Sequence, residues 1–308
     1  MGVVLKTVLA KKLLTKLRPA QKFAAIRKGR VVRGKVRRLR RLGKAAAVAA
    51  VALPFAMIAP ERPGKRMSAP FLGVNYAHRG LHSEDKSVPE NSLEAFRLAA
   101  EAGYGIELDV QLSRDGQVVV FHDDTLDRVC GVSGRVDDYS FTELQKLSLC
   151  GTEQRIPLLV DVLATIAGRS PLIVELKTGR HNPELCKKTY ELLSDYDGDV
   201  CVESFDPLIV LWFRMFGRDL MRGQLAAEKE DYEKYMNPVL SAALSKCFFN
   251  FLGRPHFIAY HIGHEPLTAK LSMKMGALNI GWTSHDPSSE KGRDGVIFEF
   301  YRPKRRYK

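Results

Sequence analysis

The possible folds are limited most by a regular alternation, from Phe71 to the end of the chain, of short β-rich runs with helical segments. Such alternation is typical of parallel β/α units. Residues 71–308 have about the length of one eight-stranded β/α barrel, typically about 250 residues. We therefore predict a TIM barrel. Nine runs are strand candidates: 73–78, 105–112, 117–123, 171–177, 199–205, 221–226, 257–262, 278–284 and 294–300.

One of these runs is surplus to an eight-stranded barrel. Only "SRDGQ", residues 113–117, separates the second run from Val118, whereas a parallel crossover needs about a dozen residues or more. The second and third runs must therefore form an antiparallel hairpin rather than two neighbouring barrel strands.

The hairpin also predicts where one histidine lies. A two-residue turn at Asp115-Gly116 places His122 opposite Asp109, and a four-residue turn places it opposite Glu107. Under either register, His122 should lie beside the acidic residues of the second strand.

Charged and polar residues gather at the ends of the predicted strands, and active sites of β/α barrels lie at the carboxyl ends of their strands. Glu107 and Asp109 are two residues apart, so their side chains point to the same face of a strand and can present two carboxylates to one ion. Together with His122, the strand-end residues predicted to surround one cavity are His78, Arg79, Glu107, Asp109, Glu175 and Lys177.

These residue types favour one chemistry. Carboxylate oxygens without cysteine are the ligands of a hard divalent cation such as Ca²⁺ or Mg²⁺. Arg79 and Lys177 add positive charge suited to a phosphate group, and two histidines can exchange protons with an attacking and a leaving oxygen. Each residue alone has a structural explanation, such as a hydrogen-bonded histidine or a cross-strand salt bridge. Their joint placement predicts cleavage of a phosphodiester.

The same residues lie in motifs that resemble those of the glycerophosphodiester phosphodiesterases. The matching stretches cover about three quarters of the chain and follow the family's order: "AHRG", "PENSLEAF", "GIELDVQLSRDGQVVVFHDDTLDRVCG", "IPLLVDVL", "LIVELK", "ESFDP" and "GWTSHD". The resemblance implies a barrel of the phospholipase C-like phosphodiesterase type. It also implies metal-dependent hydrolysis of glycerol phosphodiesters to glycerol 3-phosphate and an alcohol.

Carried over by motif, the resemblance also implies the role of each residue. Glu107, Asp109 and Glu175 would hold the metal, and His78 and His122 would be the general acid and base. Arg79 and Lys177 would contact the phosphate, and Trp282 would line the pocket near the glycerol. Glu90 and Asn91 would position the loop after the first strand.

One departure from the family pattern concerns the last strand. The family usually has a Thr-Asp pair where this chain has Phe298-Glu299, so the rim of the site on the leaving-group side should differ. This chain also lacks the longer insertion after the His-Asp pair that family members acting on small soluble diesters often carry. A more open cleft beside a membrane anchor would suit lipid-like diesters. A phospholipase D-like enzyme acting on lysophospholipids with the same site is therefore an alternative function.

The N-terminus has a different composition. Residues 1–44 hold 16 Lys and Arg and no acidic residue, which leaves 32 basic against 35 acidic residues in the rest of the chain. The uncharged stretch 45–60 follows; it is shorter than the roughly 20 residues of a spanning helix, but its basic flank suits a membrane anchor. We predict a basic arm (1–44), an anchor (45–60), a linker (61–70) and a barrel domain (71–308).

Charge asymmetry around the anchor predicts a cytoplasmic N-terminus and an external barrel. The arm could instead lie on an anionic membrane surface as an amphipathic helix, or be simply a solvated basic arm. A further alternative function is that the arm itself binds anionic lipid or nucleic acid. Nucleic-acid binding is not expected, because the arm lacks interleaved aromatic residues for stacking on bases. No obligate protein partner is indicated, and the five scattered cysteines show neither zinc nor redox spacing.

Overall fold

The structure, a computed structural model, describes residues 38, 40–43, 49–50 and 52–308. The chain divides into two compact units, Met1–Phe55 and Ala56–Lys308. The predicted basic arm lies almost entirely outside the described residues, and the predicted anchor partly so. Among the described residues, no helix combines the length and the apolar character that crossing a membrane requires. Membrane attachment therefore stays a prediction from the sequence.

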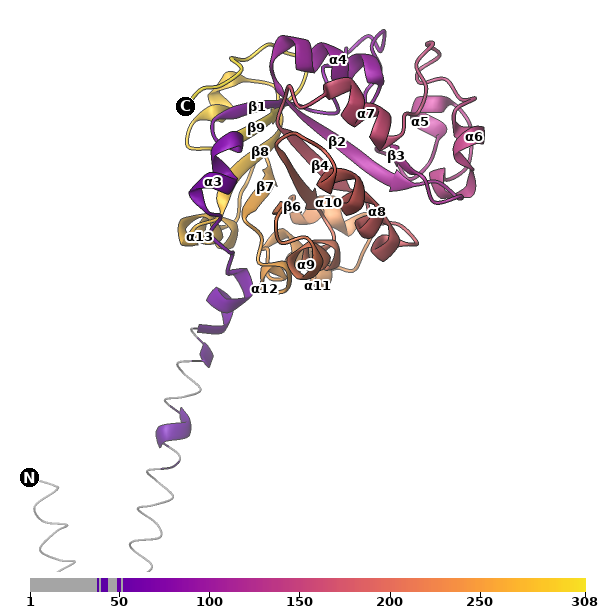
Figure 1. The fold of residues 1–308 in the computed structure, drawn as a ribbon. Coiled ribbons are helices and arrows are strands. Elements are labelled where there is room, and N and C mark those ends of the chain that lie inside the picture. The colour runs from indigo at the N-terminus through magenta and orange to yellow at the C-terminus, as the bar shows by residue number, and fades with distance from the viewer. Residues whose placement is uncertain (1–37, 39, 44–48, 51) are drawn as a thin grey trace, which may run out of the picture. The chain divides into compact units, whose positions relative to one another are not determined.

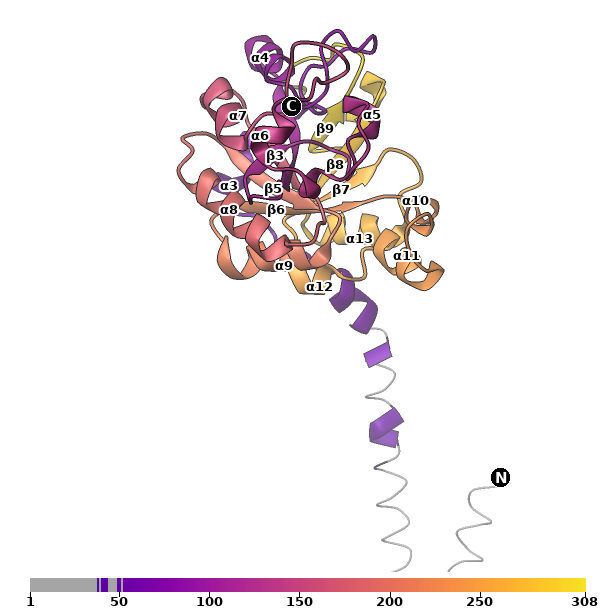
Figure 2. The same ribbon diagram turned by 90° about the vertical axis from the view of Figure 1, so that its right-hand side faces the viewer.

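The second unit is the predicted barrel (Figures 1 and 2). Eight parallel strands are joined in the order β1, β9, β8, β7, β6, β5, β4 and β2, and β1 pairs with β2 to close the ring. The ninth strand, β3, pairs antiparallel with β2, as the short connection requires. The strands are β1 (Val74–Ala77), β2 (Gly105–Leu112), β3 (Val118–Val120), β4 (Leu172–Leu176), β5 (Val200–Ser204), β6 (Met221–Ala226), β7 (Phe257–His261), β8 (Leu278–Ser284) and β9 (Gly295–Phe298).

Helices connect the strands and surround the barrel (Figure 1). The helix after β1 shows why the sequence forms it: the Ser92 hydroxyl accepts a hydrogen bond from the Ala95 N–H at its start, and Gly103 ends it with a φ of 75°. The helices are α3 (Lys65–Ser68), α4 (Leu93–Ala102), α5 (Asp127–Cys130), α6 (Phe141–Leu144), α7 (Leu159–Ile166), α8 (Asn182–Ser194), α9 (Pro207–Phe216), α10 (Lys229–Glu233), α11 (Pro238–Ser245), α12 (Asn250–Gly253) and α13 (Leu267–Met275), with short 3₁₀ turns at Ala69–Phe71, Val136–Asp138 and Pro287–Glu290.

The compact unit begins before the predicted domain boundary at residue 71. Ile58 is 1% exposed, and its carbonyl accepts a hydrogen bond of 2.8 Å from the Ser272 hydroxyl. Glu61 pairs at 2.5 Å with the buried guanidinium of Arg222. The segment assigned from the sequence to the end of the anchor and to the linker therefore packs with the barrel.

The register of the hairpin differs from both predicted registers. Leu112 pairs with Val118, and the Ser113 N–H donates to the Gln117 carbonyl at 3.0 Å. The loop therefore contains three residues, and its last, Gly116, has a φ of 74°, a conformation that favours glycine. A loop with an odd number of residues was not among the turns expected from the Asp-Gly dipeptide.

A buried histidine near the amino ends of the strands should make stability depend on pH. His256 is 4% exposed, and its Nδ1 accepts a hydrogen bond from the Arg222 N–H. Burial, and then the charge of Arg222, lower the pKa of His256 to about 4. The unfolded chain binds a proton below its ordinary value of 6.5, so the folded state loses stability as the pH falls from that value toward the folded pKa.

We expect His256→Asn, which keeps an acceptor for the Arg222 N–H, to flatten this pH dependence. Between near-neutral pH and about pH 5, wild type should lose about 2 kcal/mol more unfolding free energy than the variant. Urea unfolding at the two pH values measures the difference. The exposed His181 provides the control His181→Asn, which should follow wild type. Parallel profiles for wild type and His256→Asn would contradict the assignment.

Candidate active site

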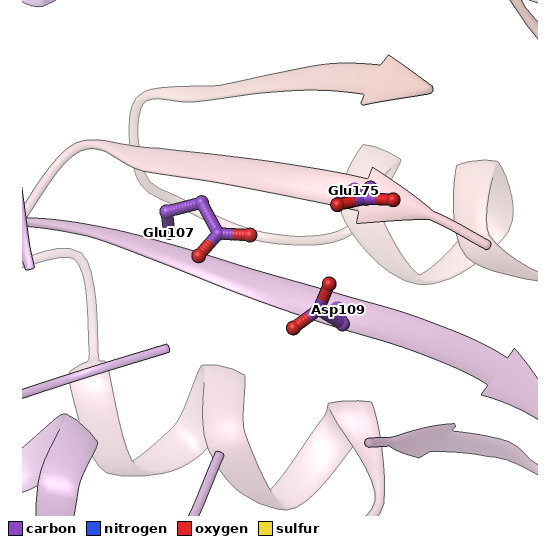
Figure 3. A group of neighbouring side chains, drawn as sticks. All are labelled: Glu107, Asp109 and Glu175. Atoms are coloured by element: carbon purple, nitrogen blue, oxygen red, sulfur yellow. The ribbon is translucent and has the colours of Figure 1, made fainter. Parts of the chain in front are cut away.

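Three carboxylates lie together at the carboxyl end of the barrel strands (Figure 3). Glu107 and Asp109 lie on β2, and Glu175 lies opposite Asp109 on β4. Each offers one oxygen within 4.8 Å of the others, and all three residues are buried. The Asp109 Oδ1 atom is buried without a hydrogen-bond partner. Three clustered hard ligands, one of them with an unsatisfied oxygen, fit a divalent cation, as the sequence predicted.

Electrostatics of the cluster also fit a cation. Burial, and then the charges of Asp109 and Glu175, raise the pKa of Glu107 well above its usual value. Burial also raises the pKa of Glu175. Burial would raise the pKa of Asp109 too, but His122, Lys177 and Arg79 hold it below its usual range. Because acidic groups this close repel one another when all are ionised, a bound cation would stabilise the set.

The two predicted cationic residues lie against these carboxylates. Lys177 Nζ is 2.8 Å from Glu175 Oε1 and 3.5 Å from Asp109 Oδ1. Burial alone would lower the pKa of Lys177, but those two carboxylates raise it above its usual value. Arg79 Nε lies 3.6 Å from Asp109 Oδ2 and has no hydrogen-bond partner. The Arg79 side chain lines the cavity of the site and can bind an anion there.

His78, at the end of β1, is held by a carboxylate that the sequence analysis did not select. Its Nδ1 lies 2.9 Å from Glu299 Oε2, and its Nε2 lies 3.9 Å from Glu107 Oε2. Burial, and then the charge of Arg79, lower the pKa of His78 to about 4. Burial would raise the pKa of Glu299, but the hydrogen bond with His78 and the neighbouring His82, whose Nε2 lies 3.8 Å from Glu299 Oε2, hold it below its usual range. The carboxylate on Nδ1 leaves Nε2 as the nitrogen directed at the ligand cluster.

His122 is arranged in the same way. Its Nδ1 lies 2.6 Å from Asp123 Oδ1, and Arg128 holds that carboxylate through its Nε at 2.6 Å. The strand β3 ends at Val120, and the Phe121 N–H still donates to the Asp109 carbonyl at 3.0 Å. Because the chain leaves the ladder there, His122 reaches the cavity of the site even though the hairpin register differs from both predictions.

Other residues support the constellation. Asn91, with a φ of 53°, donates from its side chain to Asp109 Oδ2 at 2.8 Å, and Glu90 pairs with Arg79 at 2.8 Å, so the loop after β1 is fixed as predicted. Glu203 on β5 lies beside Glu175 in the sheet. Burial, and then the charge of Glu175, raise the pKa of Glu203 well above its usual value. Its position at a strand end was a signal that could have selected it.

All eight predicted site residues therefore meet in one place. A cavity of about 70 Å³ is lined by six of them, together with Glu203 and Phe205, while Asp109 and Lys177 contact its walls. The six are His78, Arg79, Glu107, His122, Glu175 and Trp282. Trp282 donates from Nε1 to the Ala226 carbonyl at 3.1 Å, which fixes its ring at the edge of the cavity.

The anchoring of His78 gives a testable prediction. We expect Glu299→Gln to lower kcat for phosphodiester hydrolysis by about 10- to 100-fold with little change in KM, because His78 loses the carboxylate that orients it and stabilises its protonated form. The same substitution in a His78→Ala background should cause no further loss, since the two residues act as a unit. Additive losses in the double variant would show that Glu299 acts independently of His78.

A TIM barrel with a buried carboxylate cluster and two carboxylate-anchored histidines defines a candidate metal-dependent phosphodiesterase. Residues 78–213 match the model of the glycerophosphoryl diester phosphodiesterase family. The putative glycerophosphodiester phosphodiesterase YhdW of Bacillus subtilis is 38% identical over 248 residues, which cover 73% of this chain and 93% of that protein. The chain belongs to the glycerophosphodiester phosphodiesterase family.

A second relative matches part of the chain, and a solved structure shares its fold. The glycerophosphodiester phosphodiesterase of Caldanaerobacter subterraneus is 38% identical over 142 residues, covering 42% of this chain and 57% of that protein. The match thus spans only about half the length of that relative. The fold is also that of an Oleispira antarctica phosphodiesterase solved with the product sn-glycerol-3-phosphate, with a TM-score of 0.61 and 23% identity over 75% of this chain and 94% of that one.

Proposed function

We propose that the protein hydrolyses glycerophosphodiesters to glycerol 3-phosphate and an alcohol, using one divalent cation, Mg²⁺ or Ca²⁺. The observation that carries the proposal is the meeting of Glu107, Asp109 and Glu175 with two histidines around one cavity. Family membership supports the same reaction.

In this proposal the three carboxylates hold the cation. When bound, the cation supplies Lewis-acid stabilisation of negative charge on the phosphate oxygens. Arg79, which lines the cavity, binds a further phosphate oxygen. Lys177, between Glu175 and Asp109, offsets their charge and adds a cation near the phosphate, and Trp282 bounds the space for the glycerol.

The imidazoles of His78 and His122 transfer the protons. Since Glu299 and Asp123 each occupy an Nδ1, the Nε2 atoms are the ones available to the reacting oxygens. One histidine takes the proton of the attacking water, and the other donates a proton to the oxygen of the departing alcohol. Both carboxylate partners stabilise the imidazolium form of their histidine during the transfer.

The location of the protein is proposed from the sequence alone. The 16 basic residues of the arm and the uncharged segment after them support attachment to a membrane, with the barrel external. Protease treatment of intact cells should then degrade the barrel. Complete protection, with degradation after lysis, would contradict that orientation.

Product identity tests the proposed reaction. The full chain incubated with glycerophosphocholine and Mg²⁺ or Ca²⁺ should release glycerol 3-phosphate and choline in equal amounts, as measured by mass spectrometry. Release of glycerol and phosphocholine instead would show that the other ester bond is cleaved. No product with either ion would contradict the proposal for small diesters.

A further inference from the structure

Two of the five cysteines, Cys130 and Cys150, are neighbours in the folded chain. Both lie in the connection from β3 to β4, which carries α5 and α6 (Figure 1). Cys130 is the last residue of α5. The Cys150 N–H donates to the Val129 carbonyl at 2.7 Å. Because that carbonyl belongs to the peptide bond between Val129 and Cys130, this hydrogen bond limits how far apart the two cysteines can be.

The separation of the two Cα atoms follows from standard covalent geometry. The Val129 carbonyl oxygen lies about 2.8 Å from the Cys130 Cα atom across their trans peptide, and about 3.6 Å from the Cys150 Cα atom across the hydrogen bond. The two Cα atoms are therefore at most about 6.4 Å apart, and a disulfide spans about 4.4–6.8 Å between Cα atoms. The backbone positions thus permit a disulfide between these residues.

The side chains of the two cysteines also lie together. Both pack against the same hydrophobic cluster, which includes Val129 and Leu149. Burial, and then the neighbouring Cys150 thiol, raise the pKa of Cys130 to about 11, and burial also raises the pKa of Cys150. The two thiols are therefore close enough to affect each other's ionisation.

Solvent access distinguishes this pair from the other cysteines. Cys186, Cys201 and Cys247 are 1%, 0% and 2% exposed, whereas Cys130 and Cys150 are only partly buried. A soluble oxidant can therefore reach the thiols of the pair in the folded protein, while the other three are shielded by the barrel and its helices.

The position of the pair connects it to the candidate active site. Arg128 lies two residues before Cys130 on α5, and its guanidinium donates to Asp123 at 2.6 and 2.9 Å and to Glu90 at 2.7 Å. Asp123 is the carboxylate that orients His122, and Glu90 pairs with the arginine that lines the cavity. Because α5 has only 4 residues, a covalent bond at its end would restrain the guanidinium that holds both carboxylates.

We propose that Cys130 and Cys150 form a disulfide bond, which restrains Arg128 and through it the orientation of His122. The bond itself does not depend on the proposed function, whereas its effect on His122 rests on that function. The barrel's proposed external location is a compartment in which disulfides persist.

The oxidant is a low-molecular-weight disulfide such as oxidised glutathione. One cysteine thiolate attacks a glutathione sulfur, which breaks the glutathione disulfide, forms a mixed disulfide and releases one glutathione. The second cysteine thiolate then attacks the protein sulfur of the mixed disulfide and releases the other glutathione. The protein loses two electrons and two thiol protons, and both are recovered in two molecules of reduced glutathione.

Peptide mapping tests the bond. Reduced full-length protein is unfolded in urea and refolded with reduced and oxidised glutathione, because both thiols react more readily before burial raises their pKa. Free thiols are then alkylated in denaturant, and the digest is analysed by mass spectrometry. We expect one linked pair, Cys130 with Cys150, and alkylation of the other three cysteines. If little protein refolds, folded protein is incubated with the same mixture at pH 9, where more thiolate is present.

Three results would overturn the inference. The first is a lasting glutathione adduct on Cys130 or Cys150 without a link between them, which would show that the thiols are accessible but cannot meet. The second is a link to any other cysteine in protein with a native circular dichroism spectrum. The third is full alkylation of both cysteines in such protein.

Activity in urea tests the effect on the site. The oxidised protein should keep its kcat for glycerophosphocholine to a urea concentration about 1 M higher than the reduced protein. In the reduced protein, kcat should fall before circular dichroism reports unfolding. Cys130→Ser and Cys150→Ser should each remove the difference between oxidised and reduced protein. Cys186→Ala, which leaves the pair intact, should retain it.

A further variant shows whether the bond acts through Arg128. In Arg128→Ala, the disulfide should still raise the urea midpoint measured by circular dichroism, but oxidised and reduced protein should lose kcat at the same urea concentration below that midpoint. A difference in kcat of wild-type size in this variant would show that the bond does not act through the guanidinium.

The two kinds of measurement separate this inference from the proposed function. If the linked peptide forms but glycerophosphocholine is not hydrolysed with Mg²⁺ or Ca²⁺, the disulfide stands and the proposed reaction fails. If hydrolysis occurs but no linked peptide forms, the reaction stands and the disulfide fails. If both occur but oxidation leaves kcat in urea unchanged, the bond stands and its effect on His122 is refuted.

Discussion

His122→Ala should lower kcat for glycerophosphocholine hydrolysis by about 10²- to 10⁴-fold, the usual contribution of a general acid or base. The imidazole is oriented by Asp123 at 2.6 Å, and His122 lines the cavity together with Glu107 and Glu175. Initial rates of glycerol 3-phosphate release at saturating Mg²⁺ measure the effect. The thermal midpoint should change little, because the side chain is 29% exposed.

A matched control is His264→Ala, since His264 is exposed and lies outside the cavity residues. This variant should hydrolyse at the wild-type rate. A kcat for His122→Ala within about threefold of wild type would refute a catalytic role for this histidine. In that case, the short contact with Asp123 would be structural.

Glu107→Gln should abolish activity and, at the same time, stabilise the metal-free protein. Glu107 is 2% exposed, and burial together with Asp109 and Glu175 raises its pKa well above the usual value. Glutamine removes the repulsion between the Glu107 carboxylate and the carboxylates of Asp109 and Glu175. It also keeps an oxygen for the backbone N–H of Arg79, which donates to Glu107 at 2.9 Å. We expect the metal-free variant to be about 1–2 kcal/mol more stable than metal-free wild type.

With the cation bound, wild type should become more stable than Glu107→Gln. Saturating Mg²⁺ or Ca²⁺ should raise the melting temperature of wild type, because a ligand that binds only the folded state stabilises it. It should leave Glu107→Gln nearly unchanged, since the carboxylate set is incomplete. Thermal melts of both proteins with chelator and with each ion measure this. The exposed Glu153 provides the control Glu153→Gln, which should respond to the ion as wild type does. An ion-induced shift of wild-type size in Glu107→Gln would contradict the proposed ligand set.

Most of the barrel could be predicted because strands and helices have different periodicities in the sequence. All nine predicted strands are present, and β2, β6 and β8 have the predicted bounds. The site followed from the strand assignment, because the carboxyl ends of parallel strands meet at one rim. That rule brought together residues as distant in sequence as His78 and Lys177, whereas Trp282 was implied only by the resemblance to the family.

The hairpin register could not be predicted from its turn dipeptide. Asp115-Gly116 is compatible with loops of several lengths, and the choice depends on contacts outside the dipeptide. In the structure the Ser113 hydroxyl donates to Asp115 Oδ1 at 2.6 Å and accepts from the Gln117 N–H at 2.9 Å. Those contacts favour the three-residue loop, and they appear only once the loop is folded.

Two other features depend on tertiary packing. Glu299 looked like a departure from the family pattern, and only the pairing of β9 with β1 places it on the Nδ1 of His78. The segment around Ile58 reads as part of an apolar stretch, but the hydrogen bonds from Ser272 and Asn250 to its carbonyl place it with the barrel. Both involve residues more than 190 positions apart, beyond the reach of local sequence patterns.

The central claim is that one divalent cation, held by Glu107, Asp109 and Glu175, is required for phosphodiester hydrolysis. The most direct measurement is a titration of metal-stripped protein with Mg²⁺ and, separately, Ca²⁺, following the heat of binding and the rate of glycerol 3-phosphate release from glycerophosphocholine in parallel. For the activating ion, we predict one bound ion per chain and a rate that rises in proportion to its occupancy. Full activity in the presence of chelator, or binding that is unaffected by Glu107→Gln, would contradict the claim.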